Sequence, residues 1–189
     1  MRIIAGKLKG AVLYLPQNKN TRPLKDRAKE NIFNLLSHSN KISLQFENSN
    51  ILDLYAGTGS FGLECLSRGS GNVCFVEKSK EVIKILEKNI HKLKFQKKTE
   101  ILSNNIFDIL KKNNFFKCKF DLIFCDPPFK DVDISKLINK IFHRNILKKG
   151  GIIVIHRKKS TDETFSNFFK IIDERIYGVS KIIFGKFLF

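Results

Sequence analysis

The stretch that most constrains the fold is the glycine-rich segment at residues 51–62, which reads Ile-Leu-Asp-Leu-Tyr-Ala-Gly-Thr-Gly-Ser-Phe-Gly. Its apolar beginning, residues 51–54, is typical of a buried strand, and the residues from Ser60 onward are typical of the first turn of a helix. Gly57 and Gly59 can adopt positive φ and bring the backbone close to a ligand. Because the following helix points free N–H groups at this turn, the segment predicts a cradle for a nucleotide-like cofactor.

Beyond residue 50 the chain alternates strand-like and helix-like segments, the pattern of a parallel sheet with crossover helices. The expected strands are residues 51–54, 73–76, 99–102, 120–125 and 151–155. The expected helices are residues 60–67, 80–91 and 106–112, with one or two more within 132–147. Two β-like runs near the end, residues 169–176 and 181–188, would close the sheet as an antiparallel pair. The pattern predicts a Rossmann-like α/β fold with a seven-stranded, mostly parallel sheet and antiparallel C-terminal strands.

The first 40 residues are expected to form an extension ahead of a main domain that spans residues 41–189. Residues 1–16 read as two short strands around a Gly/Lys turn, which predicts a hairpin. A helix is expected to follow from Asp26, as its N-cap, to about Ser37.

A strong positive charge points to a polyanionic partner, most simply a nucleic acid. The net charge is +17, and residues 1–30 hold eight basic residues against two acidic ones. Part of the lysine excess is open to another reading, because Lys, Asn, Ile and Phe are all abundant, as a compositionally biased genome would make them. Arginine is rarer, so Arg2, Arg22 and Arg27 are the stronger candidates for nucleic-acid contacts.

The bulk composition excludes several classes of protein. At 189 residues and 42% apolar content, the chain is long enough for one domain with a sizeable core. No apolar run approaches the roughly 20 residues that span a bilayer, and the first residues lack a signal-peptide core. The cysteines at 65, 74, 118 and 125 lack zinc-site spacing. We expect a cytoplasmic protein with reduced thiols, no bound metal and no membrane association.

The choice of cofactor depends on two carboxylates near the glycine-rich segment. Residues 57–62 match the G-x-G-x-x-G pattern, and Glu77, 18 residues beyond Gly59, can accept hydrogen bonds from both hydroxyls of a ribose. Enzymes that bind dinucleotides and enzymes that bind S-adenosylmethionine (SAM) both use a carboxylate in this way. Asp53 separates them, because a carboxylate at the cofactor mouth repels a pyrophosphate but suits a sulfonium and an α-ammonium. The pattern therefore favours SAM.

A second motif, Asp126-Pro127-Pro128-Phe129, follows an apolar strand and has a rationale in methyl transfer. An exocyclic amino group on a base is a poor nucleophile, because its lone pair is delocalised into the ring. Hydrogen bonds from its N–H groups to the Asp126 carboxylate and the Pro127 carbonyl would favour a pyramidal nitrogen. The prolines stiffen the turn, and Phe129 offers a face on which the base can stack. These four residues are the expected catalytic set.

Asn104 and Asn105 end the third expected strand and could read the adenine edge of the cofactor, and Asn105 is the favoured one. The open alternative for Asn105 is a helix N-cap. The full set expected to bind the cofactor is Asp53, Tyr55, Gly57, Thr58, Gly59, Glu77 and Asn105.

Together these motifs resemble the class I SAM-dependent methyltransferases that act on amino groups. The N-terminal pattern of Arg2 to Gly6, Gly10, Arg22-Pro23, Asp26-Arg27, Glu30 and Phe33-Asn34 resembles the RsmD family, bacterial enzymes that methylate N2 of a guanine in 16S ribosomal RNA (rRNA). The resemblance covers almost the whole chain.

The resemblance implies that the glycine-rich segment, Glu77 and Asn105 bind SAM and that residues 126–129 hold the guanine amino group. It also implies that Arg22 and Arg27 face the active site or the RNA. The expected partner is 16S rRNA, within a 30S subunit or an assembly intermediate, bound by a monomeric enzyme. Leu24 departs from the family, which commonly has Thr after the Arg-Pro pair, as does Tyr55, where Phe is frequent.

Three alternatives remain open at the level of sequence. A DNA adenine-N6 methyltransferase shares the Asp-Pro-Pro-Phe motif but usually needs a target-recognition domain, for which this chain has little room. A non-catalytic RNA-binding or assembly factor would not need an intact Asp126 and both prolines. A nucleotide-dependent oxidoreductase is disfavoured by Asp53.

Overall fold

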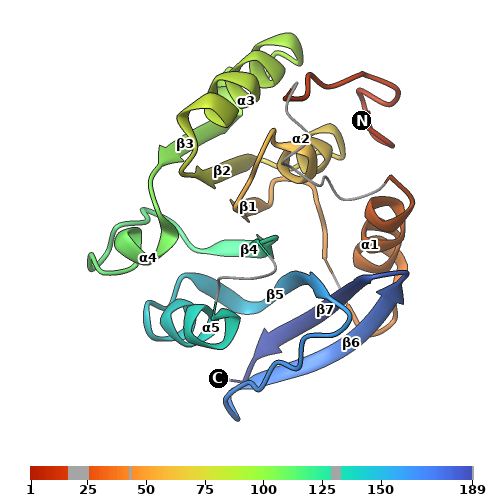
Figure 1. Cartoon of the computed structure of the whole chain (residues 1–189). Coiled ribbons are helices and arrows are strands. Elements are labelled where there is room, and N and C mark those ends of the chain that lie inside the picture. Colours follow the sequence, from red (N-terminus) through yellow and green to blue (C-terminus); the bar gives the residue numbers. More distant parts are fainter. Residues whose placement is uncertain (17–25, 43, 129–132, 189) are drawn as a thin grey trace.

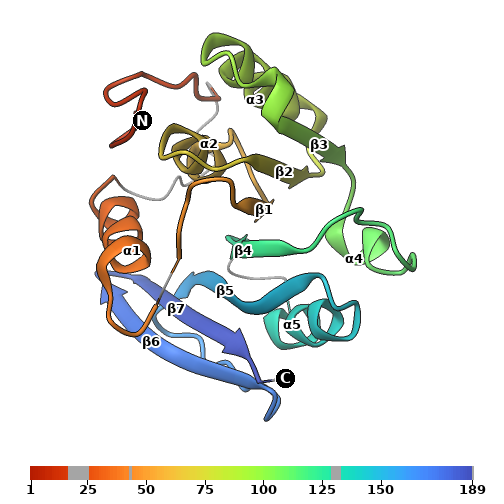
Figure 2. The same ribbon diagram turned by 180° about the vertical axis from the view of Figure 1, so that it is seen from behind.

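The computed structural model describes residues 1–16, 26–42, 44–128 and 133–188. Within these ranges the chain forms one seven-stranded sheet in the order β3-β2-β1-β4-β5-β7-β6, flanked by helices (Figures 1 and 2). Strands β1 to β5 are parallel, and β7 is antiparallel to both of its neighbours. The predicted α/β fold with an antiparallel C-terminal pair is confirmed.

The bounds of the elements lie close to the predicted ones. The strands are β1 (Asn50–Leu54), β2 (Asn72–Glu77), β3 (Thr99–Ser103), β4 (Phe120–Cys125), β5 (Leu147–Lys158), β6 (Phe169–Tyr177) and β7 (Ser180–Phe187). The helices are α1 (Asp26–His38), α2 (Ser60–Ser67), α3 (Lys80–Lys92), α4 (Ile106–Ile109) and α5 (Ile134–His143), with a 3-10 turn η1 (Gln96–Lys98).

Two elements differ in length from the prediction. Helix α4 ends at Ile109 instead of residue 112, because the polar residues that follow Leu110 have no apolar side chain to bury. Strand β5 is longer than predicted at both ends, because Leu147 pairs with Phe120 of β4, and His156, Arg157 and Lys158 pair with β7. These three polar residues follow an apolar run, which is typical of the end of a strand. Pairing with the antiparallel strand β7 keeps their backbone hydrogen bonded, so the strand continues.

The sheet separates two hydrophobic cores, since successive strand residues face opposite sides. On one side Ile51, Phe75, Phe124 and Val154 pack with apolar residues of α1, α2 and α3. On the other side, apolar residues of α4 and α5 pack against the alternate strand residues, which are Leu52, Leu54, Cys74, Val76, Ile123, Cys125, Ile153, Ile155 and Ile183. The central strands β1, β2 and β4 are therefore buried on both faces, which is why their sequences are largely apolar runs, whereas the flanking strands β3 and β6 are mostly exposed or half-buried.

Residues 1–16 form a loose hairpin whose strand pairing is an isolated Arg2–Val12 bridge. Around it the Ile3 N–H donates to the Ala11 carbonyl at 2.9 Å. Ile3 and Leu13 are buried in the core that contains α1, α2 and α3. The hairpin thus packs directly on the main fold, while the predicted domain boundary at residue 40 stays a prediction.

A buried charge cluster fastens the hairpin and α1 to α2. The Glu64 carboxylate accepts hydrogen bonds from the backbone N–H groups of Ile4 and Ala5, at 2.7 and 2.9 Å, and from Arg68 Nε at 2.9 Å. Lys29 Nζ lies 3.7 Å from Glu64, and both side chains are fully buried. Burial lowers the pKa of Lys29, and the charge of Glu64 opposes that shift.

None of the helices in the described ranges has the length and apolar character that a membrane span requires. The four cysteines are free thiols, of which Cys118 is exposed and the others are buried. Burial raises the pKa of each of these thiols.

Candidate functional site

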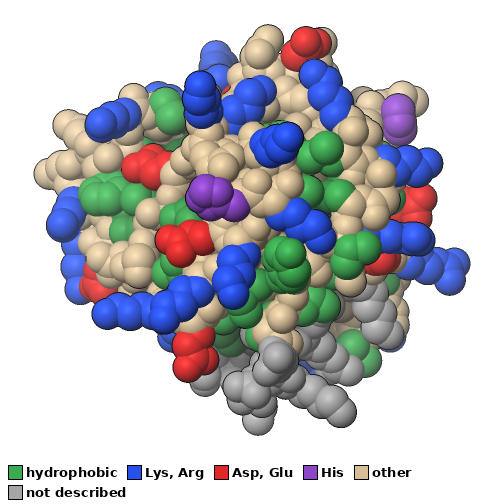
Figure 3. All heavy atoms as spheres, turned by 90° about the horizontal axis from the view of Figure 1, so that it is seen from above, with side chains coloured by type: hydrophobic (Ala, Val, Ile, Leu, Met, Phe, Trp, Pro, Cys, Tyr) green, Lys and Arg blue, Asp and Glu red, His purple; other side chains and the backbone are tan. Residues whose placement is uncertain are grey.

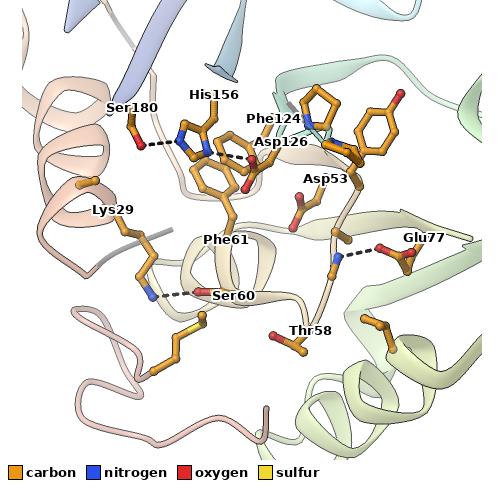
Figure 4. A pocket seen from close by; sticks show the side chains of 18 of the residues that line it. Lys29, Asp53, Thr58, Ser60, Phe61, Glu77, Phe124, Asp126, His156 and Ser180 are labelled. Carbon is orange, nitrogen blue, oxygen red and sulfur yellow. Dashed lines mark hydrogen bonds and ion pairs between the residues drawn. The ribbon is translucent and has the colours of Figure 1, made fainter. Parts of the chain in front are cut away.

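A cavity of about 1360 Å³ opens at the carboxyl ends of the parallel strands (Figure 4). Tyr55, Glu77 and Asp126 reach it from the residues that end or follow β1, β2 and β4, and His156 reaches it from β5. Arg27 of α1 and residues 176–180 of the β6–β7 turn also line it. This is the edge where open α/β sheets bind their ligands, so the fold brings most of the predicted site residues together.

The glycine-rich turn has the left-handed backbone that its sequence predicted. Tyr55, Gly57 and Gly59 have φ of 59°, 56° and 83°. A Cβ on Gly59 would lie 2.4 Å from Leu86 Cδ1, whereas a Cβ on Gly57 would have no atom within 4 Å. Gly59 is therefore required for packing against α3, and Gly57 leaves space along the wall of the cavity.

Glu77 ties this turn to the end of β2. Its Oε2 accepts from the Gly57 N–H at 3.0 Å, and its Oε1 accepts from the N–H groups of Lys78 and Ser79 at 2.9 Å each. Glu77 lines the cavity beside Gly57. The predicted ribose contact stays a prediction, and the structure adds a second task for this carboxylate, namely holding the turn.

Asp53 is almost completely buried beneath the turn, with 1% of its surface exposed. Its Oδ2 accepts from the Gly62 N–H at 2.9 Å. Burial raises the pKa of the Asp53 carboxyl well above its ordinary value, the Gly62 hydrogen bond opposes this, and the charges of Asp126 and Glu77 add to it. A cation bound in the cavity would compensate the ionised carboxylate, so the site fits a positively charged ligand.

The Asp126 turn is held by two successive residues of β5. Asp126 Oδ1 lies 2.7 Å from His156 Nδ1. Arg157 Nη1 donates to the Pro128 carbonyl at 3.4 Å, and Arg157 Nε donates to Glu163 Oε1 at 2.6 Å. Because side chains alternate along a strand, His156 and Arg157 hold the turn from opposite faces of the sheet.

Pro127 and Pro128 line the cavity beside Asp126, as the motif predicted. Phe129 lies outside the described residues. An aromatic wall is nevertheless present, because the rings of Phe61 and Phe124 stack with centroids 3.8 Å apart and planes inclined by 5°, and both line the cavity. Sequence reasoning missed this pair, since each residue read as ordinary core.

The remaining predicted cofactor residues lie in different places. Thr58 lines the cavity, and its carbonyl accepts from the buried Asn89 side chain at 3.0 Å. Asn105 is the N-cap of α4, where its Oδ1 accepts from the Phe107 N–H at 2.9 Å. Asn105 is not among the described residues that line the cavity. The helix N-cap role, which the sequence left open for it, is therefore observed, and its contact with adenine stays a prediction.

The three candidate arginines are also separated. Arg27 is exposed and lines the cavity. Arg2 is exposed outside the cavity lining, with its Nε 4.0 Å from the Asp26 carboxylate. Arg22 lies outside the described residues. In the part of the chain that the structure covers, no three His, Cys, Asp or Glu side chains are grouped as metal ligands.

Comparison with known proteins gives a consistent picture. The family model described as conserved hypothetical protein 95 matches residues 1–186. A protein of Haemophilus influenzae named ribosomal RNA small subunit methyltransferase D is 32% identical over 180 residues, which are 95% of this chain and 90% of that protein. A putative rRNA methyltransferase of Bacillus subtilis is 32% identical over 162 residues, covering 86% of this chain and 85% of that protein.

Solved structures agree with the fold. The crystal structure of a putative methylase from Haemophilus influenzae superposes with a TM-score of 0.79 at 30% identity, covering 99% of this chain and 98% of that one. A putative methyltransferase from Escherichia coli has the same fold, with a TM-score of 0.83 at 24% identity and coverage of 98% and 96%. These matches confirm the resemblance drawn from the sequence motifs. The chain therefore belongs to the conserved hypothetical protein 95 family, the RsmD family of class I SAM-dependent methyltransferases.

Proposed function

We propose that the protein transfers a methyl group from SAM to the exocyclic N2 amino group of a guanine in 16S rRNA. It would act in the cytoplasm as a monomer, on a 30S subunit or an assembly intermediate. The names of the relatives support an rRNA substrate. The observation that carries the proposal is that Asp126, Pro127 and the cofactor turn share one cavity.

On the cofactor side, the residues fit SAM by shape and by charge. SAM supplies an electrophilic methyl group on a positively charged sulfur. Gly57 leaves room for close approach of a ligand, and Glu77 stands beside it with carboxylate oxygens suited to ribose hydroxyls. Asp53 supplies a buried negative charge that a cation would stabilise in its ionised form. Tyr55 and Thr58 complete this wall of the cavity.

On the substrate side, the residues suit an amino group attached to an aromatic ring. The Asp126 carboxylate and the Pro127 carbonyl would accept the two N–H bonds of the amine, which favours a pyramidal nitrogen whose lone pair points toward the methyl group. Phe129 and the Phe61–Phe124 wall would pack on the flat faces of the bound molecules. The gain comes mainly from position and electrostatics.

The charge of the surface suits RNA as the carrier of that base. Basic side chains are spread over the face seen in Figure 3 and outnumber the acidic ones. Arg27 lies at the cavity itself, and Arg2 and Arg22 belong to the same N-terminal segment. We propose that these arginines contact rRNA phosphates next to the target nucleotide.

The test is to incubate the protein with methyl-labelled SAM and one of three acceptors: naked 16S rRNA, 30S particles from a strain without the enzyme, or duplex DNA. Nucleoside analysis then identifies the product. We expect N2-methylguanosine from one of the two RNA acceptors, and no label with the Asp126→Asn variant. Labelled N6-methyladenine in DNA would overturn the proposal in favour of the DNA methyltransferase alternative.

A further inference from the structure

His156 is a buried histidine that the two predicted motifs do not use, and it occupies a central place in the cavity. It is 4% exposed and follows Ile155 on β5. Its Nδ1 lies 2.7 Å from Asp126 Oδ1, and its Nε2 lies 2.9 Å from Ser180 Oγ. Figure 4 shows the three side chains as a continuous hydrogen-bonded chain along one wall.

The chemistry of the two partners determines which ring nitrogen carries the proton. An Asp carboxylate only accepts hydrogen bonds, so the bond to Asp126 requires a proton on Nδ1. A serine hydroxyl donates as readily as it accepts, so Ser180 can donate to an unprotonated Nε2. The arrangement therefore places a proton on Nδ1, and Ser180 holds the ring in place through Nε2.

The order and register of the strands bring Asp126, His156 and Ser180 together. Asp126 follows the last residue of β4, Cys125, which is in register with Ile155 of β5. His156 is consequently the next residue along and lies beside Asp126. Ser180 begins β7, which is antiparallel to β5 and in register with it at Lys158. Three strands thus contribute to the chain of contacts, with His156 touching Asp126 on one side and Ser180 on the other.

We propose that His156 is a positioning residue for the methyl transfer, a role that rests on the proposed function. Its Nδ1–H bond occupies Asp126 Oδ1 and orients the carboxylate so that Oδ2 faces the amine. In the reaction a nitrogen–carbon bond forms as the carbon–sulfur bond breaks. One N–H proton then passes from the methylated nitrogen to Asp126 and on to solvent. His156 keeps its Nδ1 proton throughout, and Ser180 holds the ring through Nε2.

The decisive experiment compares His156→Phe with His156→Asn, because the Asn amide nitrogen falls near the position of Nδ1 and can donate to Asp126. We expect His156→Phe to lower kcat roughly 100-fold, the cost of a misplaced catalytic group, with the KM for SAM unchanged. His156→Asn should recover most of that loss. Ser180→Ala should cost less, roughly 3- to 10-fold, because the Asp126 bond remains. His143→Phe, an exposed position on α5, is the matched control.

A readout independent of activity tests the tautomer. The ¹⁵N spectrum of histidine-labelled protein, with His156 assigned from the His156→Asn variant, should show the Nδ1–H form. The equilibrium dissociation constant for SAM, measured by calorimetry, should be the same in the wild type and in every His156 variant. A change of that constant would instead place His156 in the cofactor seat and overturn the positioning role.

The outcomes separate this inference from the proposed function. A wild-type protein that forms no N2-methylguanosine on either RNA acceptor defeats the proposed function, and the ¹⁵N spectrum still decides the tautomer. If the wild type is active, a folded His156→Phe variant with wild-type kcat defeats the inference alone. An Asn variant as impaired as the Phe variant also defeats it, because His156 would then only fill space. A neutral Nε2–H spectrum contradicts the donor role directly.

Discussion

Glu77 and Asp126 are both carboxylates at or next to the ends of parallel strands, and both line the same cavity. Glu77 is held by backbone N–H groups, of Gly57 and of its own two successors. Asp126 is held by a side chain, His156, which is itself bonded to Ser180 on another strand. The proposed cofactor side thus depends on one turn and the end of one strand, whereas the proposed substrate side depends on side chains from three strands.

This difference teaches where substitutions should act. Backbone partners cannot be removed by mutation, so the cofactor side is expected to fail through changes in backbone conformation or in the buried charge of Asp53. The substrate side is expected to fail through single side chains, with the cofactor seat left intact. The predictions that follow test this separation, beginning with the largest expected effect.

Replacing Asp126 by Ala should reduce methyl transfer by roughly three orders of magnitude, because the amine loses its main acceptor. The dissociation constant for SAM should change little, since the carboxylates of the cofactor side remain. Single-turnover kinetics and calorimetry measure the two quantities separately. Loss of SAM binding in this variant would show that the two sides are not independent.

Gly59→Ala and Gly57→Ala form a matched pair within one turn. Gly59→Ala should lower the free energy of unfolding by about 2 kcal/mol or more, from left-handed strain and from the contact with Leu86. Gly57→Ala introduces the left-handed strain without a steric contact, so it should lower the free energy of unfolding by only about 1 kcal/mol. It should still weaken SAM binding, because its methyl group enters the cavity. Denaturant melts and calorimetry distinguish them, and equal stability losses would contradict the packing argument.

Asp53→Asn should weaken SAM binding and increase the stability of the folded protein. Burial raises the pKa of Asp53 in the folded protein, so the folded state binds the proton more tightly than the unfolded state. The stability contribution of Asp53 therefore falls as pH rises from its unfolded pKa toward the folded one. The Asn variant lacks this dependence and should be more stable at pH 7, by about 1 kcal/mol.

The same Asn variant should bind SAM roughly 10-fold more weakly, because it no longer offers a charge to the cation. Unfolding measured from pH 4 to pH 8, with and without SAM, tests both halves. A stability difference that shrinks as pH rises would mean that the buried carboxyl is stabilised by other groups.

Arg27→Ala should produce the smallest effect, a loss of RNA affinity of a few-fold. The plot of log affinity against log salt should become shallower by about one unit, as expected for one lost phosphate contact. SAM affinity should stay the same. Filter binding with 16S rRNA fragments at several salt concentrations measures the slope, and an unchanged slope would remove Arg27 from the RNA contacts.

The conformation of the glycine-rich turn, which we propose as the cofactor side, was predictable because the residues that define it are close in sequence. The apolar run before Gly57, the glycines and the helix that follows form a unit whose backbone requirements can be read residue by residue. Asp53 and Glu77 were recognisable because they stand at strand ends near that unit. The Asp126 motif was recognisable for the same reason.

The sequence by itself therefore determined the sheet with its crossover helices, and it predicted the glycine-rich turn and the Asp126 turn that we propose as the cofactor and substrate sides. Only the tertiary structure decided what holds that turn. His156 reaches Asp126 because β5 lies beside β4, and Ser180 reaches His156 because β7 pairs with β5. These pairs are 30 and 24 residues apart, so they leave no local sequence pattern. Strand order and register arise from packing of the whole sheet, so side chains that meet through them are visible only once the chain is folded.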